Sequence, residues 1–130
     1  MARARGYAGV RNLRYLEAIM KLFIRCVAGE VRLGPGKIKL LELIGQHGSI
    51  SEAARAMEMS YRRAWLLVAE LNQSFRLPVT TAQTGGKGGG HAELTPFGQD
   101  LIRRYRTIEH DAAAAVADQL KALSAELAHP

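Results

Sequence analysis

The stretch GSISEAARAMEMSYRRAWLLVAELN, residues 48–72, decides the fold because it contains two helix start signals separated by a short turn. At the first signal, Ser49 precedes Glu52 by three residues, the spacing of a capping box in which each side chain satisfies a free backbone N–H of the other. These residues predict a short helix whose small inner face lets another helix approach closely. The apolar positions of that face are Ile50, Ala53, Ala54 and Met57.

A longer helix is predicted from a cap at Ser60 to about Phe75. Spacings of three and four residues separate an inward face from an outward face that is free to meet a partner. The inward face consists of Ala64, Leu67, Val68, Leu71 and Phe75. The outward face consists of Arg62, Leu66, Ala69 and Gln73, flanked by Arg63 and Trp65.

Upstream, the sequence predicts a β-hairpin and one more helix. Residues 22–33, LFIRCVAGEVRL, place β-branched and aromatic residues on both sides of Ala28–Gly29, which favours two short strands. Pro35 suits a first helical position, where its missing N–H is no loss, and Gly48 suits a helix end. We therefore expect a helix between them.

Downstream, the segment TGGKGGGH, residues 84–91, has five glycines around one lysine and lies between the strand candidates VTTAQ and AEL. It could be a phosphate-binding loop, a linker or a hairpin tip. Neither Gly86–Lys87 nor Gly36–Lys37 has the earlier glycine and the following serine or threonine that a phosphate-binding P-loop needs. A hairpin tip whose backbone approaches a sugar-phosphate chain remains the best interpretation, because glycine has no Cβ to obstruct that approach.

A last helix is predicted to begin at TPFGQ, with Thr95 as cap and Pro96 at the first position. Apolar residues then recur at spacings of three and four, which predicts a single helix of about 30 residues and about 45 Å. No element of one protomer is long enough to cover it, so we expect it to hold a homodimer together. Its seam residues are Leu101, Tyr105, Ile108, Ala112, Val116, Leu120, Leu123 and Leu127.

Charge and composition limit the class of protein. The net charge is +6, and residues 1–39 hold nine Lys or Arg against two acids, which suits a polyanionic partner. We expect residues 1–19 to be a basic arm, either disordered or loosely helical. No apolar run approaches the roughly 20 residues of a membrane span, no signal peptide is evident, and Cys26 is the one cysteine. A bacterial cytoplasmic protein associated with the nucleoid is therefore expected, with no membrane partner.

Catalysis and metal binding are not predicted. No nucleophile lies in a recognisable turn motif and no acids are paired for general acid–base chemistry, so we expect no enzyme. The four histidines have no metal-ligand spacing among themselves or with the cysteine, so we expect no metal site. The histidines are His47, His91, His110 and His129.

Helix, helix, turn, helix and hairpin in this order predict a winged helix-turn-helix, a mainly α fold with a small β wing. We expect a basic arm at 1–19, the DNA-binding domain with its N-terminal hairpin at 20–95 and a dimerisation helix at 96–130.

The sequence resembles the DNA-binding domain of ModE-type molybdate-responsive transcriptional repressors in three segments, GSISEAARAMEMSYRRAWLLVAELN, TGGKGGG and LTPFG. Its helix-turn-helix is also similar to that of LysR-type regulators. The resemblance covers about residues 33–108. It implies a symmetric dimer on double-stranded DNA, with the helix after Ser60 in the major groove, the glycine loop against the backbone and the last helix at the dimer contact.

Full-length members of this family carry a C-terminal pair of small β-domains that bind molybdate, whereas this sequence ends at Pro130. We therefore expect no cofactor, and little effect of molybdate on DNA binding.

Nine residues are candidates for DNA contact. Arg62 can bond a guanine edge bidentately, although a surface or phosphate role is equally open, and Arg63 suits a phosphate. Leu66 suits packing against thymine methyls. Tyr61 projects toward the buried side of its helix, so packing in the core is an alternative to DNA contact. An aromatic residue such as Trp65 more often packs at the rim of a helix than it contacts DNA. The remaining candidates are the caps Ser49 and Ser60, and Lys87 and His91 in the glycine loop.

Two functions from different classes remain. The first is a sequence-specific, homodimeric transcriptional regulator that reads a pseudo-palindrome. The second is a protein-interaction module on the same fold, which uses its basic arm and third helix to bind an acidic partner. The exposed Arg62–Leu66 face and the glycine loop favour the first.

Overall fold

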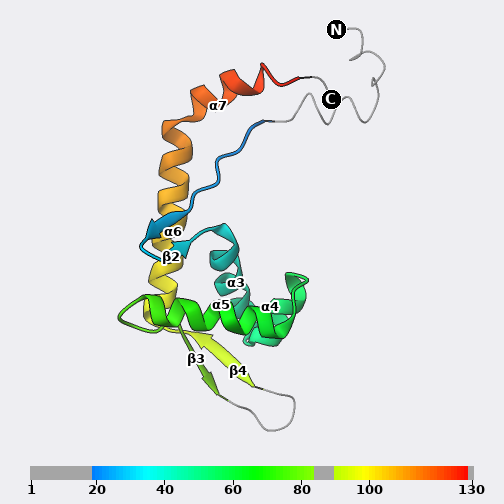
Figure 1. The fold of residues 1–130 in the computed structure, drawn as a ribbon, viewed down its shortest axis with the longest axis vertical. Coiled ribbons are helices and arrows are strands. Elements are labelled where there is room, and N and C mark those ends of the chain that lie inside the picture. Colours follow the sequence, from blue (N-terminus) through cyan, green and yellow to red (C-terminus); the bar gives the residue numbers. More distant parts are fainter. Residues whose placement is uncertain (1–18, 84–89, 129–130) are drawn as a thin grey trace. The chain divides into compact units, whose positions relative to one another are not determined.

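The computed structural model describes residues 19–83 and 90–128. They fall into two compact units, which are described separately: Phe23–Glu109, and residues 19–22 together with 110–128. The elements, all but β1 labelled in Figure 1, are β1 (Cys26–Ala28), β2 (Val31–Leu33), α3 (Pro35–His47), α4 (Ile50–Ala56), α5 (Tyr61–Ser74), β3 (Thr80–Gln83), β4 (His91–Leu94), α6 (Pro96–Ala115) and α7 (Ala117–Ser124).

The predicted N-terminal hairpin is confirmed. Strands β1 and β2 pair antiparallel with Cys26 opposite Leu33 and Ala28 opposite Val31. Gly29 turns the chain between them with a φ of 60°, a left-handed conformation that glycine adopts without a Cβ clash. The hairpin leads directly into α3, which starts at the expected proline and ends at Gly48, whose N–H donates to the carbonyl of Ile44 at 2.8 Å.

The capping box at α4 forms only in part. The Ser49 hydroxyl accepts a hydrogen bond from the Glu52 N–H at 3.0 Å, as predicted. The Glu52 carboxylate, however, accepts from the guanidinium of Arg55 at 3.0 Å. The exposed ion pair one helical turn away thus replaces the expected bond from Glu52 back to the serine backbone.

Two clusters of buried residues hold the 23–109 unit together. The first cluster joins α3, α4 and α5 to strand β4 of the wing, and its members are Leu40, Leu43, Ile44, Ile50, Ala53, Ala54, Ala64, Val68 and Ala92. The second joins the N-terminal hairpin, α3, α5 and α6, and its members are Leu33, Ile38, Leu41, Leu71, Val79, Leu101 and Tyr105. Three helices followed by a β-hairpin on this shared core are a winged helix-turn-helix.

The wing is the antiparallel pair β3–β4, with Thr80 opposite Leu94 and Gln83 opposite His91. Its base lies at Val79, a residue with no exposed surface. The side-chain oxygen of Asn72, near the end of α5, accepts from the Val79 N–H at 2.7 Å and from the Thr80 N–H at 3.3 Å. Asn72 therefore attaches the wing to α5.

Helix α6 is attached to the same place. The Thr95 N–H donates to the Val79 carbonyl at 3.0 Å, and the Thr95 hydroxyl donates to the Pro78 carbonyl at 2.7 Å. The same hydroxyl caps α6 by accepting from the Gly98 N–H at 2.9 Å, which confirms the predicted cap. A Cβ on Gly98 would lie 2.2 Å from the Val79 carbonyl oxygen, so only glycine fits there without movement of the backbone.

The prediction of one uninterrupted C-terminal helix is wrong. Helix α6 ends at Ala115 and α7 begins at Ala117, with Val116 between them at φ −110° and ψ 11°. The break comes at Val116, directly after four alanines, the residue type with the highest helix propensity. The β-branched side chain of the valine disfavours helix relative to these alanines.

Two residues of the predicted dimer seam belong to the protomer itself. Leu101 and Tyr105 are 6% and 1% exposed, and the Tyr105 hydroxyl donates to the Ile24 carbonyl at 2.5 Å. Their side chains are therefore not available to a second copy, which corrects their assignment to the dimer interface. Burial raises the pKa of the Tyr105 phenol, and the nearby Glu109 carboxylate adds to this effect.

The other seam residues are more accessible. Ile108, Leu123 and Leu127 are about half exposed, and Ala112, Val116 and Leu120 are half-buried. In the second unit, the Met20 N–H donates to the Ser124 hydroxyl at 2.8 Å, and that hydroxyl donates to the Leu120 carbonyl at 2.6 Å.

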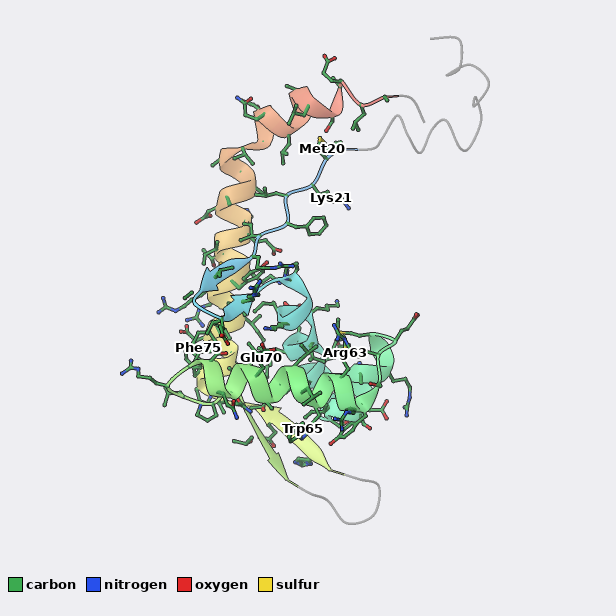
Figure 2. All side chains as sticks on the ribbon, in the orientation of Figure 1. Met20, Lys21, Arg63, Trp65, Glu70 and Phe75 are labelled. Atoms are coloured by element: carbon green, nitrogen blue, oxygen red, sulfur yellow. The ribbon has the colours of Figure 1, made fainter. Side chains whose placement is uncertain are left out.

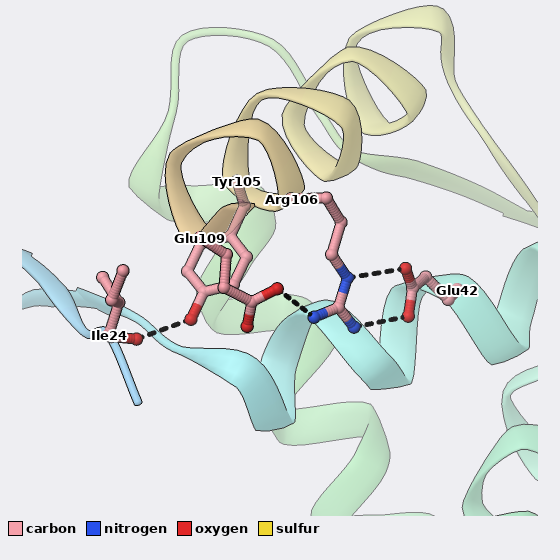
Figure 3. A network of polar contacts seen from close by, with 5 residues as sticks. All are labelled: Ile24, Glu42, Tyr105, Arg106 and Glu109. Atoms are coloured by element: carbon pink, nitrogen blue, oxygen red, sulfur yellow. Dashed lines mark hydrogen bonds and ion pairs between the residues drawn. The ribbon is translucent and has the colours of Figure 1, made fainter. Parts of the chain in front are cut away.

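An ion-pair network joins α6 to α3 (Figure 3). The guanidinium of Arg106 donates to both carboxylate oxygens of Glu42, at 3.0 and 2.8 Å, and to Glu109 at 2.7 Å. The hydrogen bonds from Arg106 hold the pKa of Glu42 below its ordinary value, and the two carboxylates raise the pKa of Arg106. Bidentate geometry of this kind fixes direction as well as distance.

Asn72→Ala should lower the free energy of unfolding by about 1–3 kcal/mol, because it leaves the buried Val79 N–H without a partner. Asn72→Asp keeps an acceptor oxygen for the Val79 N–H, so it should lower the free energy of unfolding much less than Asn72→Ala. Gln73→Ala, at the exposed neighbouring position, is the control. Urea unfolding followed by circular dichroism measures all three, and equal stability of Asn72→Ala and Gln73→Ala would contradict the assigned role.

Glu42→Gln should destabilise the protein at neutral pH by about 1 kcal/mol, since the pair is about one third exposed and screened by water. The pKa of Glu42 is lowered on folding, so its contribution is complete above about pH 4.5 and disappears as the pH falls through the folded-state pKa. The difference in the free energy of unfolding between wild type and variant should therefore be smaller at pH 3 than at pH 7. Glu58→Gln, which changes an exposed carboxylate, should show no such difference.

Candidate nucleic-acid interface

The turn before α5 sets where that helix begins. Glu58 has a φ of 56°, the left-handed conformation, and it reverses the chain after α4. The Met59 N–H then donates to the Ala54 carbonyl at 3.0 Å. The Ser60 hydroxyl accepts from the Arg63 N–H at 3.1 Å, which confirms its role as the cap of α5.

The rotation of α5 about its axis is fixed by its buried residues. Ala64, Val68 and Leu71 are at most 4% exposed and pack in the two core clusters. Residues on the opposite side of the helix must then face solvent, as the helical period requires. Arg62 and Leu66 are accordingly exposed, which confirms the predicted division of this helix into two faces.

The first two turns of α5 present an unusual combination of side chains to solvent. Tyr61, Trp65 and Leu66 are 55%, 49% and 48% exposed. Arg62 and Arg63 are also exposed, and neither has an ion-pair partner within residues 19–83 and 90–128. Tyr61 does not pack in the core, contrary to the alternative raised by its helical projection, because the chain enters α5 at this residue.

Figure 2 shows how two of these side chains leave the helix. Trp65 extends from α5 on the side of the wing strands, whereas Arg63, two positions earlier, extends from the opposite side. Two residues of helix correspond to a rotation of about 200°, so these side chains flank the outward face formed by Arg62 and Leu66.

The remaining candidates lie on other elements. Ser49 is the cap of α4 and its hydroxyl accepts from that helix, so its predicted contact with DNA is not needed to explain it. His91 begins strand β4, is exposed, and has its Nε2 3.8 Å from a carboxylate oxygen of Glu93. Lys87 and the glycine loop 84–89 lie outside the described residues.

Asn72, which positions the wing against α5, is the residue of this interface that the sequence analysis did not identify. It follows Val68 by four positions and therefore lies beside the buried face of α5. A polar side chain at such a position needs a hydrogen-bond partner, and this requirement was a usable signal. The partner, the backbone of Val79 and Thr80, could not be named without the tertiary structure.

Other kinds of site find little support. Within the described residues, there is no group of three or more His, Cys, Asp or Glu side chains arranged to hold a metal ion. None of the helices in this part of the chain is long and apolar enough to cross a membrane. The solvent-facing start of α5, next to the wing, is the surface best suited to a ligand. Its two arginines, which have no ion-pair partner in the described part of the chain, suit a polyanion.

Known proteins agree with this geometry. The family model of the bacterial regulatory helix-turn-helix proteins of the lysR family matches residues 36–99, from α3 to the start of α6. The molybdenum-pterin-binding protein MopB of Rhodobacter capsulatus is 42% identical over 106 residues, which cover 77% of this chain and 39% of that protein.

Two further relatives are named as regulators or transport proteins. The DNA-binding transcriptional dual regulator ModE of Escherichia coli K12 is 45% identical over 71 residues, covering 55% of this chain and 27% of ModE. The molybdenum transport protein ModE of Azotobacter vinelandii is 33% identical over 84 residues, covering 65% of this chain and 31% of that protein.

This chain thus spans between 27% and 39% of the length of these three relatives. The matched region coincides with the winged helix-turn-helix described above. Residues 36–99 therefore match the bacterial regulatory helix-turn-helix domain of the lysR family, and the chain is similar over that region to the ModE and Mop proteins.

Proposed function

We propose that this protein is a transcriptional regulator that binds specific DNA sequences as a homodimer in the bacterial cytoplasm, and that it acts as a repressor. The observation that supports this most is the exposed start of α5, where Arg62 and Arg63 extend from a capped helix whose opposite face is buried. A helix presented in this way enters the DNA major groove in helix-turn-helix proteins.

Within this proposal, the position of each side chain determines whether it contacts a base or the DNA backbone. Arg62 shares the outward face with Leu66 and reads a base edge, because a guanidinium can donate two parallel hydrogen bonds to guanine. Arg63 leaves the side of the helix and contacts a phosphate, together with the hydroxyls of Ser60 and Tyr61. The wing, with His91 and Lys87, lies along the DNA backbone and adds affinity without reading sequence.

A homodimer is supported by the second unit. Helix α7 has eight residues and none of them is buried, although Leu120, Leu123 and Leu127 lie along it and just beyond its end. An isolated helix of this length is marginal in water. A second copy that covers these leucines would stabilise α7, and a twofold dimer would place two α5 helices on a pseudo-palindromic site.

Arg62→Ala should weaken binding to the operator by about 1–3 kcal/mol and binding to random duplex much less. The operator is first identified by gel shift of the purified protein on genomic fragments. Arg63→Ala, the matched control, should weaken binding to both duplexes alike and reduce the salt dependence by about one unit. Equal losses for Arg62→Ala on both duplexes would make it a backbone contact, and no shifted fragment at all would favour a protein-interaction module instead.

Leu123→Glu should convert the dimer to monomers at micromolar concentration and weaken operator binding with it, because the charge would be buried between copies. Gln119→Glu adds the same charge to an exposed position of α7 and should leave the dimer intact. Light scattering gives the mass of each variant. A Leu123→Glu protein that remains dimeric would show that α7 does not hold the protomers together.

A further inference from the structure

The outward face of α5 contains apolar side chains that the protomer does not use. Leu66 lies four positions after Arg62, and Ala69 and Gln73 continue the same row at helical spacing. Leu66 is 48% exposed, while the core on the other side of the helix is complete without it: every residue of that core cluster from α5 is at most 4% exposed. The leucine is therefore available to a partner at the centre of the presented face.

The occupant of this face follows from its neighbours. Two exposed arginines, Arg62 and Arg63, lie one helical turn before Leu66 and have no ion-pair partner in the described part of the chain. This surface suits a polyanion and disfavours a basic or wholly apolar protein surface. Duplex DNA is the polyanion that the helix-turn-helix geometry admits. In its major groove, the 5-methyl group of thymine is the apolar feature, whereas the other base edges offer hydrogen-bond donors and acceptors.

An apolar side chain on a polar base edge is unfavourable, because it removes water from donors and acceptors without replacing their hydrogen bonds. Against a methyl group the same contact is favourable, since both surfaces are apolar. Ala69, one turn further along the row, is small enough to let the helix approach the bases closely at that point. A leucine at this position would thus favour thymine by attraction and disfavour the other bases by exclusion.

We propose that Leu66 is a specificity-determining residue that reads the 5-methyl group of a thymine in each half-site, next to the base read by Arg62. This inference rests on the proposed function, and it adds the chemical group that is recognised and the residue that recognises it.

The test uses the full chain and the tightest-binding duplex that it selects from a random-sequence library. Each thymine is replaced singly by deoxyuridine, which removes the methyl group and keeps the base pair. For the wild type, one replacement per half-site should weaken binding about threefold to fivefold, which corresponds to the transfer free energy of one buried methyl group. Leu66→Ala should bind the thymine duplex more weakly and should lose nothing further when that thymine becomes uracil.

The matched control is Leu77→Ala, which removes a leucine that is 58% exposed but lies outside α5. It should retain the full thymine preference, and circular dichroism should show all variants folded. Indifference of the wild type to every uracil, or an unchanged uracil penalty in Leu66→Ala, would overturn this inference while DNA binding itself persists. If the library yields no bound duplex, the proposed function fails and this inference with it.

Discussion

The peptide groups on either side of Val79 are the point on which the rest of the structure depends. The Val79 N–H is bound by the side chain of Asn72 from α5, and its carbonyl accepts from the Thr95 N–H at the start of α6. Gly98 approaches that carbonyl so closely that any side chain would collide with it. Because Val79 is completely buried, its polar backbone groups must find partners inside the protein, and these two partners come from α5 and from the residue that caps α6.

The consequence for DNA recognition is geometric. Helix α5 is proposed to enter the major groove, and the wing is proposed to follow the DNA backbone. The hydrogen bonds of Asn72 attach the first residues of the wing directly to α5, so that these two elements are joined by more than the loop at 75–78. Ala92 of the wing also belongs to the core cluster beneath α5, and its N–H donates to the Gly48 carbonyl at 2.9 Å. A preorganised pair of contacts loses less conformational entropy on binding than two independently mobile ones.

A second connection ties the helix-turn-helix to α6. Arg106 reaches Glu42 on α3 and Glu109 on its own helix, and Tyr105 beside it binds the backbone of Ile24. These contacts surround the second core cluster with directed polar bonds, whose geometry is more restrictive than apolar packing. The part of α6 up to Glu109 is therefore held in one position against the helix-turn-helix.

The sequence by itself determined the local features: the caps at Ser49, Ser60 and Thr95, the end of α3 at Gly48, and the outward row of Arg62 and Leu66. Each depends on hydrogen bonds or periodicity within a few residues.

Only the tertiary structure decided what covers each apolar face. Leu101 and Tyr105 continue the same spacing as Leu123 and Leu127, yet the first two lie in the protomer core and the last two are exposed. Likewise, Asn72 is recognisable as a polar residue needing a partner, but Val79 becomes that partner through folding. Periodicity fixes which side of a helix is apolar, whereas the surface that meets it depends on contacts between residues distant in the chain.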